Sequence, residues 1–179
     1  GLRRAPWYRR LKLFAKRLVG REPWLWPAPP PGLVEYDGWA FVPGRLAPGA
    51  RVWSFGVGTS VEFELELVRR CGVVVDLFDP SPVSVDWVAR QAWPPALAFH
   101  PWALAARDGT LRLAARGGGD GPPVMYSAVD TTRTGPAVEA EALTVASVRA
   151  RLGTGAVALA KLDVEGVEFD VLPELLALD

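Results

Sequence analysis

The sequence has little of the chemistry that disulfides and metal sites require. Its 179 residues include one cysteine, Cys71, and one histidine, His100. A lone cysteine cannot form an intramolecular disulfide, and a zinc site usually needs several Cys or His ligands. The composition therefore argues against a zinc site and favours a reducing compartment, with the cytoplasm as the expected location.

An excess of charge of one sign and long apolar runs are also absent. Twenty Lys and Arg residues balance twenty Asp and Glu residues. Proteins that bind nucleic acids usually carry a basic excess, and here only the N-terminal segment does. No apolar run reaches the roughly 20 residues of a transmembrane helix. We therefore expect no nucleic-acid partner and no spanning segment, although a start at Gly1 leaves open an upstream signal or anchor segment.

The N-terminal region, residues 1–45, is predicted to be a basic amphipathic helix followed by a connector. In residues 2–18, apolar side chains recur at spacings of four, three and four, as on one face of a helix. We favour a helix that packs on its own domain with a solvated basic face; the alternative is contact with an anionic membrane surface or a partner. Residues 22–32 hold five prolines and two tryptophans, which excludes a regular helix. Residues 35–43 are predicted to add a short strand.

Residues 46–179 alternate between predicted strands and helices, which is typical of an α/β fold with a mostly parallel sheet. Residues 61–70 are ambiguous, since they fit both strand alternation and helical spacing; Glu and Leu favour a helix, and Gly72 would end it. The expected parallel strands are 51–55, 73–78, 96–99 and 156–162, with the order reversing beside the first. The other expected helices are 82–91, 144–152 and 167–178, and the other expected strands are 110–114 and 138–143.

Two motifs fall where such a sheet binds ligands, at the carboxyl ends of its strands. Gly56 and Gly58 follow the first strand, where glycines let the backbone turn tightly and approach a ligand. Asp79 follows the second strand, about 20 residues later, which is the spacing expected for an acid that accepts ribose hydroxyls. A plain turn aspartate before Pro80 is the alternative. Val61 stands where the dinucleotide fingerprint has its third glycine, which counts against a nicotinamide cofactor.

A third motif, residues 161–168 (KLDVEGVE), leaves the last predicted strand. Asp163 and Glu165 would emerge together at the carboxyl end of that strand, beside the other two motifs. Carboxylates there can act as a base, bind a metal or hold an amine. The alternative is that acids cap the start of the next helix, where the helix dipole favours them, and for Glu168 we expect only that.

Taken in order and spacing, these motifs resemble those of FkbM-type methyltransferases, and the resemblance covers roughly residues 51–176. Its elements are residues 53–58 (WSFGVG), 78–80 (FDP), 103–109 (ALAARDG) and 161–168. The resemblance implies a Rossmann-like fold that uses S-adenosyl-L-methionine to methylate a hydroxyl of a sugar or another small metabolite.

The resemblance also implies roles for individual residues. Gly56 and Gly58 would border the methionine part of the cofactor, Asp79 would take the ribose, and Pro101 and Trp102 would lie near the adenine. Ser54 stands in the same site, where many methyltransferases carry an acid.

For catalysis, Asp163 and Glu165 are the expected residues, because Asp163 matches the methyl-transfer end of the site. Asp163 is the first choice for the base, and His100, more often structural when alone, is the alternative. Tyr126 and Ser127 are expected near the acceptor.

Other interpretations stay open. The chain could be a non-catalytic relative that binds a cofactor or a partner, and a nicotinamide-dependent oxidoreductase is a weaker alternative. The chain ends at Asp179, before the further strands that the resemblance implies, so we expect an incomplete domain. Residues 156–162 would then form an unpaired edge strand, which invites self-association.

Overall fold

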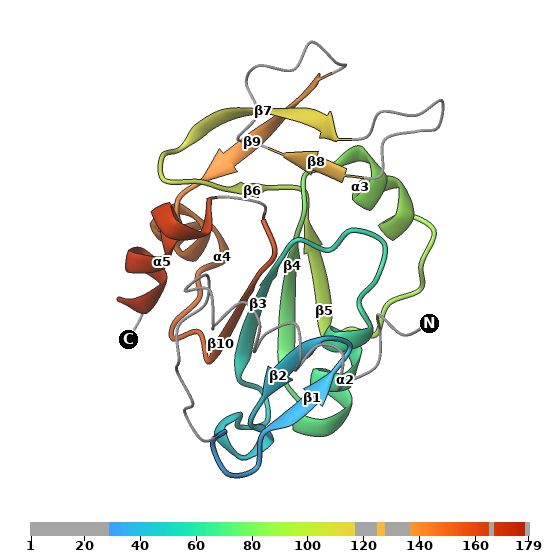
Figure 1. Cartoon of the computed structure of the whole chain (residues 1–179), viewed down its shortest axis with the longest axis vertical. Helices are drawn as coiled ribbons and strands as arrows, with labels where there is room; N and C mark the ends of the chain where they lie inside the picture. The colour runs from blue at the N-terminus through green and yellow to red at the C-terminus, as the bar shows by residue number, and fades with distance from the viewer. Residues whose placement is uncertain (1–28, 117–124, 128–136, 165–166, 178–179) are drawn as a thin grey trace, which may run out of the picture. The chain divides into compact units, whose positions relative to one another are not determined.

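The structure is a computed structural model that describes residues 29–116, 125–127, 137–164 and 167–177 (Figure 1). Contacts divide the chain into two compact units, Gly1–Pro31 and Gly32–Asp179. The helix expected over residues 2–18 lies outside the described residues. The second unit begins at Gly32, so residues 32–45, which the sequence grouped with the N-terminal region, share a unit with the α/β domain.

The main sheet has four parallel strands in the order β10-β3-β4-β5. Their bounds are β3 (Arg51–Phe55), β4 (Val74–Phe78), β5 (Leu97–His100) and β10 (Leu159–Leu162). From β3 the chain moves through β4 to β5, and β10 then pairs with the opposite side of β3. The predicted α/β class, the four parallel strands and the reversal beside the first strand are all confirmed. The arrangement is consistent with a Rossmann-like fold.

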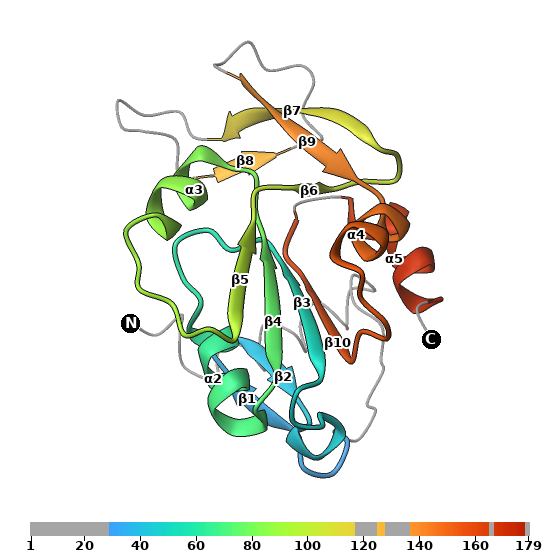
Figure 2. The ribbon, with the colours of Figure 1, turned by 180° about the vertical axis from the view of Figure 1, so that it is seen from behind.

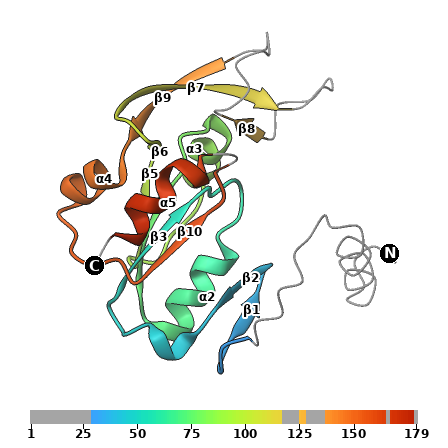
Figure 3. The same ribbon diagram turned by 60° about the vertical axis from the view of Figure 1, so that its left-hand side comes forward.

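One face of this sheet is covered by α2 (Glu62–Cys71), α3 (Pro82–Val88) and the hairpin of β1 (Val34–Tyr36) and β2 (Trp39–Phe41) (Figure 3). On α2, Phe63, Leu67 and Cys71 are spaced four apart and buried against the sheet. The helix ends at Gly72, whose φ of 66° is the left-handed cap that glycine favours. The helical prediction for residues 61–70 is thereby confirmed. The side chains that pack on the sheet follow the helical spacing and not the strand alternation.

The other face packs against α4 (Val145–Leu152) and α5 (Glu168–Leu176), which Figure 2 shows from behind. Trp53, Phe55 and Phe78 form the aromatic centre of this layer, and all three are buried. Thr144 caps α4 by accepting a hydrogen bond from the Ser147 amide, at the start of the helix expected over residues 144–152.

A second sheet lies across the carboxyl ends of the parallel strands (Figures 1 and 2). Its order is β6-β9-β7-β8, and β7 runs antiparallel to both of its neighbours. The strands are β6 (Ala103–Leu104), β7 (Gly109–Arg116), β8 (Met125–Ser127) and β9 (Ala137–Leu143). The strands expected at 110–114 and 138–143 exist, but the sequence did not predict that they form a separate sheet over this end. Among the described helices, none has the length and apolarity to cross a membrane.

Candidate functional site

A pocket of about 320 Å³ opens at the carboxyl ends of β3, β4 and β10. Its floor is the glycine turn after β3 and the segments that follow β4 and β10. Its walls come from the start of α2, from Asp37 and Trp39 of the β1–β2 hairpin, and from Leu111 and Leu113 of the second sheet. The pocket lies beside β3, where the strand order reverses. Open α/β sheets bind ligands at such a reversal, because the loops on either side diverge and leave a crevice.

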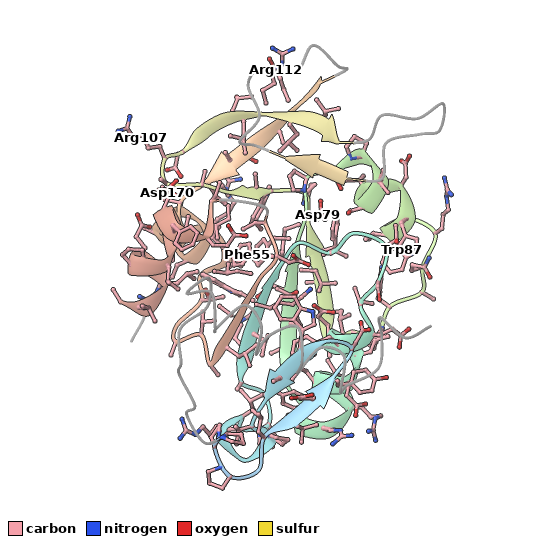
Figure 4. The ribbon with its side chains drawn as sticks, in the orientation of Figure 1. Phe55, Asp79, Trp87, Arg107, Arg112 and Asp170 are labelled. Atoms are coloured by element: carbon pink, nitrogen blue, oxygen red, sulfur yellow. The ribbon has the colours of Figure 1, made fainter. Side chains whose placement is uncertain are left out.

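Asp79 joins the loop after β4 to the glycine turn. Its Oδ2 accepts hydrogen bonds from the amides of Val57 and Gly58, at 3.0 and 2.9 Å. Its Oδ1 accepts the amide of Ser81 at 2.9 Å. Figure 4 shows Asp79 at the end of the parallel strands, below the second sheet. A carboxylate has about four acceptor positions, so three amides leave it about one for a ligand.

The two glycines of the turn have different reasons to be glycine. Both have positive φ, 87° at Gly56 and 57° at Gly58. A Cβ on Gly56 would lie 2.1 Å from the carbonyl oxygen of Asp163, whereas a Cβ on Gly58 would meet no atom within 4 Å. Gly56 therefore allows β3 and β10 to approach each other, and Gly58 leaves room in the pocket.

Beneath the turn, Glu64 of α2 forms a buried polar cluster with Ser54 of β3 and Lys161 of β10. Oε1 of Glu64 accepts a hydrogen bond from Ser54 Oγ at 2.5 Å and another from Lys161 Nζ at 3.1 Å. Lys161 also donates to the carbonyl of Gly56 at 3.2 Å, and its Nζ lies 4.9 Å from the centre of the Trp39 ring. The three elements thus meet on one carboxylate at the pocket wall.

Asp163 follows β10 at the edge of the pocket. Its amide donates to the carbonyl of Phe55 at 3.0 Å, which continues the pairing of β10 with β3, and its side chain is exposed. An exposed carboxylate at the pocket can accept a proton from a bound hydroxyl. Glu165 lies outside the described residues, as do the side chains of Tyr126 and Ser127.

His100 takes part in a separate network, on the opposite face of the sheet from Glu64. Its Nε2 lies 3.1 Å from Oδ1 of Asp76, and Arg51 donates to Oδ2 of Asp76 at 2.6 Å. Burial raises the pKa of Asp76, but the hydrogen bonds from His100 and Arg51 outweigh it and leave that pKa below its usual range. The imidazole stacks against both Phe78 and Trp102, with ring centres 5.1 and 4.7 Å away, and those two rings lie 6.2 Å from each other. His100 does not line the pocket, so the structural interpretation of this residue fits better than that of a base.

Of the residues expected at the site, five line the pocket, namely Gly56, Gly58, Asp79, Trp102 and Asp163. Ser54 is fully buried and reaches the pocket only through Glu64, while Pro101 is exposed and does not line it. Trp39 and Glu64 also line the pocket, and neither was predicted from the sequence. A signal for Glu64 existed, because it lies three residues before Leu67 and so on the buried side of α2.

The charge of the pocket is unbalanced. Among the described residues that line it, four are carboxylates and one is an ammonium, Lys161. The carboxylates are Asp37, Glu64, Asp79 and Asp163. A partly enclosed site with excess negative charge attracts cations and repels anions.

Comparison of the chain with models of protein families, with curated proteins and with solved structures finds no match.

Proposed function

We propose that the chain binds S-adenosylmethionine in this pocket and transfers its methyl group to a hydroxyl of a small-molecule acceptor. The observation that carries the proposal is the juxtaposition, at the reversal of a parallel sheet, of a glycine turn and an aspartate that still has one free acceptor position. The resemblance of the three motifs to FkbM-type methyltransferases points to the same cofactor.

The residues fit an adenosine-type cofactor. Asp79 can accept one ribose hydroxyl through Oδ1 without giving up an amide, since that oxygen carries only the Ser81 hydrogen bond. Gly58 leaves the pocket open beside it. Trp102 also lines the pocket, and the resemblance implies that it lies near the adenine. A volume of about 320 Å³ lies at the lower end of the range for small-molecule sites, about 300–1,000 Å³.

The electrostatics favour this cofactor over a dinucleotide. S-adenosylmethionine carries a positive sulfonium, which the surplus of carboxylates would attract. The pyrophosphate of NAD carries negative charges that the same carboxylates would repel. This repulsion, together with Val61 in place of the third glycine, argues against a nicotinamide-dependent oxidoreductase.

The cofactor, when bound, supplies an activated methyl group, so the chain has to position an acceptor and take its proton. Asp163 is the residue proposed to take that proton, because it is an exposed carboxylate at the pocket edge. The apolar side chains of Leu104, Leu111 and Leu113 provide a wall against which the acceptor can pack.

Titration calorimetry with S-adenosylmethionine, S-adenosylhomocysteine and NAD tests the proposal. We expect the first two to bind and NAD not to bind. Binding of NAD alone, or of none of the three, would overturn it. A methyl-transfer assay over a panel of sugars and other hydroxyl compounds then separates an enzyme from the second candidate, a non-catalytic relative that binds the cofactor without turnover.

A further inference from the structure

Glu64 is the most deeply buried charged residue at the pocket, with 1% of its surface exposed. Burying a carboxylate is costly unless hydrogen bonds and opposite charge compensate it. Lys161, exposed to 7%, and Ser54, fully buried, supply part of that compensation. The roles proposed above for Asp79 and Asp163 leave Glu64 unexplained.

The compensation reaches only one of its two oxygens. Both hydrogen bonds, from Ser54 and from Lys161, end on Oε1. None of the described residues donates a hydrogen bond to Oε2. Oε2 is also not one of the fully enclosed side-chain atoms without a partner, so part of its surface is accessible. Since Glu64 lines the pocket, Oε2 is the acceptor that it offers there.

Lys161 holds this arrangement in place. Its ammonium donates to Glu64 and to the carbonyl of Gly56, and it also faces the Trp39 ring. With its donors engaged in this way, Lys161 fixes the carboxylate, and a ligand has to bring its own donor to Oε2. In a pocket with surplus carboxylates, a cationic donor is the favoured one.

We infer that Oε2 of Glu64 binds the α-ammonium group of an amino-acid moiety, which in the proposed function is the methionine end of the cofactor. The inference rests on that proposed function. Glu64 lies on the glycine-turn side of the pocket, linked to Gly56 through Lys161, while Asp79 takes the ribose. Ser54 then does not contact the cofactor itself, because its hydroxyl orients the carboxylate that α2 supplies.

The test compares two ligands that differ by the amino-acid end. S-adenosylhomocysteine has it, and 5′-methylthioadenosine has the same nucleoside and thioether without it. We expect Glu64→Gln to weaken S-adenosylhomocysteine about ten- to a hundredfold, the range for a hydrogen bond to a charged group. The affinity for 5′-methylthioadenosine should stay within about twofold of that of the unmodified chain.

Two further variants guard against trivial explanations. Glu66→Gln makes the same chemical change on the same helix, at a residue that pairs with Arg69 and Arg70 and does not line the pocket, so both affinities should be retained. Glu64→Gln combined with Lys161→Met removes both buried charges together, which avoids an unpaired ammonium if the single variant folds poorly. We expect this double variant to bind S-adenosylhomocysteine more weakly and to keep its affinity for 5′-methylthioadenosine.

The outcomes separate this inference from the proposed function. If the unmodified chain binds neither ligand, the proposed function fails and the inference fails with it. If it binds both, and the Glu64 variants weaken both ligands equally or neither, the role of Glu64 is wrong while cofactor binding stands. A selective loss for S-adenosylhomocysteine supports both.

Discussion

Glu64 and Asp76 are both buried carboxylates beside the same parallel sheet, but they lie on opposite faces and their oxygens are used differently. Asp76, on β4, has both oxygens occupied, Oδ1 by His100 and Oδ2 by Arg51. Glu64, on α2, receives both of its hydrogen bonds on Oε1 and lines a pocket. Burial and charge are therefore similar, and the difference is that each oxygen of Asp76 has a protein donor whereas Oε2 of Glu64 has none among the described residues.

That difference separates structural charges from candidate binding groups. A buried charge that has a protein donor on each oxygen and lies away from the pocket is costly to disrupt and is not available to a ligand. A buried charge with one acceptor open to a pocket gains from a ligand that supplies the missing donor. The two glycines differ in the same way, because the space beside Gly56 is filled by Asp163 and the space beside Gly58 is empty.

The largest expected effect comes from Gly56→Ala. The new methyl group would lie 2.1 Å from the Asp163 carbonyl, at a φ of 87°. Relieving that contact has to move β3 and β10 apart, so we expect a loss of about 3 kcal/mol or more in the free energy of unfolding. Urea unfolding followed by circular dichroism measures it. A loss below about 1 kcal/mol would show that the backbone yields there easily.

Asp76→Ala should give the next largest loss of stability without a loss of ligand affinity. The substitution leaves His100 and Arg51 without their carboxylate, and breaking a buried pair costs about 3–5 kcal/mol. Because Arg51 is half-buried and can turn to water, we expect about 2–3 kcal/mol. The affinity for S-adenosylhomocysteine should not change, since Asp76 does not line the pocket. A large loss of affinity in the folded variant would contradict the separation of the two faces.

Asp79→Ala should weaken S-adenosylhomocysteine by about 1.5–3 kcal/mol through loss of the ribose contact. Unlike Glu64→Gln, it should weaken 5′-methylthioadenosine as well, because both ligands contain the ribose. The variant also removes the acceptor of three backbone amides, so its unfolding has to be measured beside its binding. Unchanged affinity in a folded variant would reject the ribose assignment.

Much of this architecture could be predicted from the sequence because its signals are local. Apolar runs placed β3, β4 and β10, and Gly72 gave the end of α2. The sequence also placed Gly56 and Asp79 at the carboxyl ends of the first two parallel strands, and the hydrogen bonds from the Val57 and Gly58 amides to Oδ2 of Asp79 join those two ends.

The features that the sequence did not predict depend on long-range packing. Glu64 contacts Lys161 across 97 positions of sequence, and no local pattern links the two. Asp76 interrupts an apolar run, but no sequence pattern near it predicts that His100 is its partner. The second sheet and the hairpin that carries Trp39 cover the pocket through tertiary contacts, so strand periodicity could predict their existence but not their position.

Gly58→Ala provides the contrast to Gly56→Ala. Its φ of 57° strains an alanine, but no atom lies within 4 Å of the new methyl group. We expect a loss of about 1–2 kcal/mol in the free energy of unfolding, the cost of the left-handed conformation alone. Because Gly58 lines the pocket, the added methyl group takes up space there, and the affinity for S-adenosylhomocysteine should fall too. Equal destabilisation by the two alanines would contradict the distinction between the glycines.

The smallest effect concerns pH and returns to the two carboxylates. The folded state holds the pKa of Asp76 below its ordinary value of 3.8, against the opposing effect of burial. A lowered folded pKa stabilises the fold fully above the unfolded value and loses that stabilisation as the pH falls through the folded one. One carboxyl changes the slope by at most about 1.4 kcal/mol per pH unit, and only within that interval.

Asp76→Asn isolates this contribution. The gap in unfolding free energy between the unmodified chain and the variant should shrink as the pH falls below about 4, where Asp76 begins to take up its proton in the unfolded chain. Glu66, whose pKa the hydrogen bond from Arg69 lowers to about 2, titrates in both proteins and so cancels in the comparison. Thermal unfolding over that pH range, run in parallel on both proteins, measures the gap. If the gap stayed constant into strong acid, the hydrogen bonds from Arg51 and His100 would not be lowering the pKa of Asp76. The conclusion that both of its oxygens are held by protein donors would then be wrong.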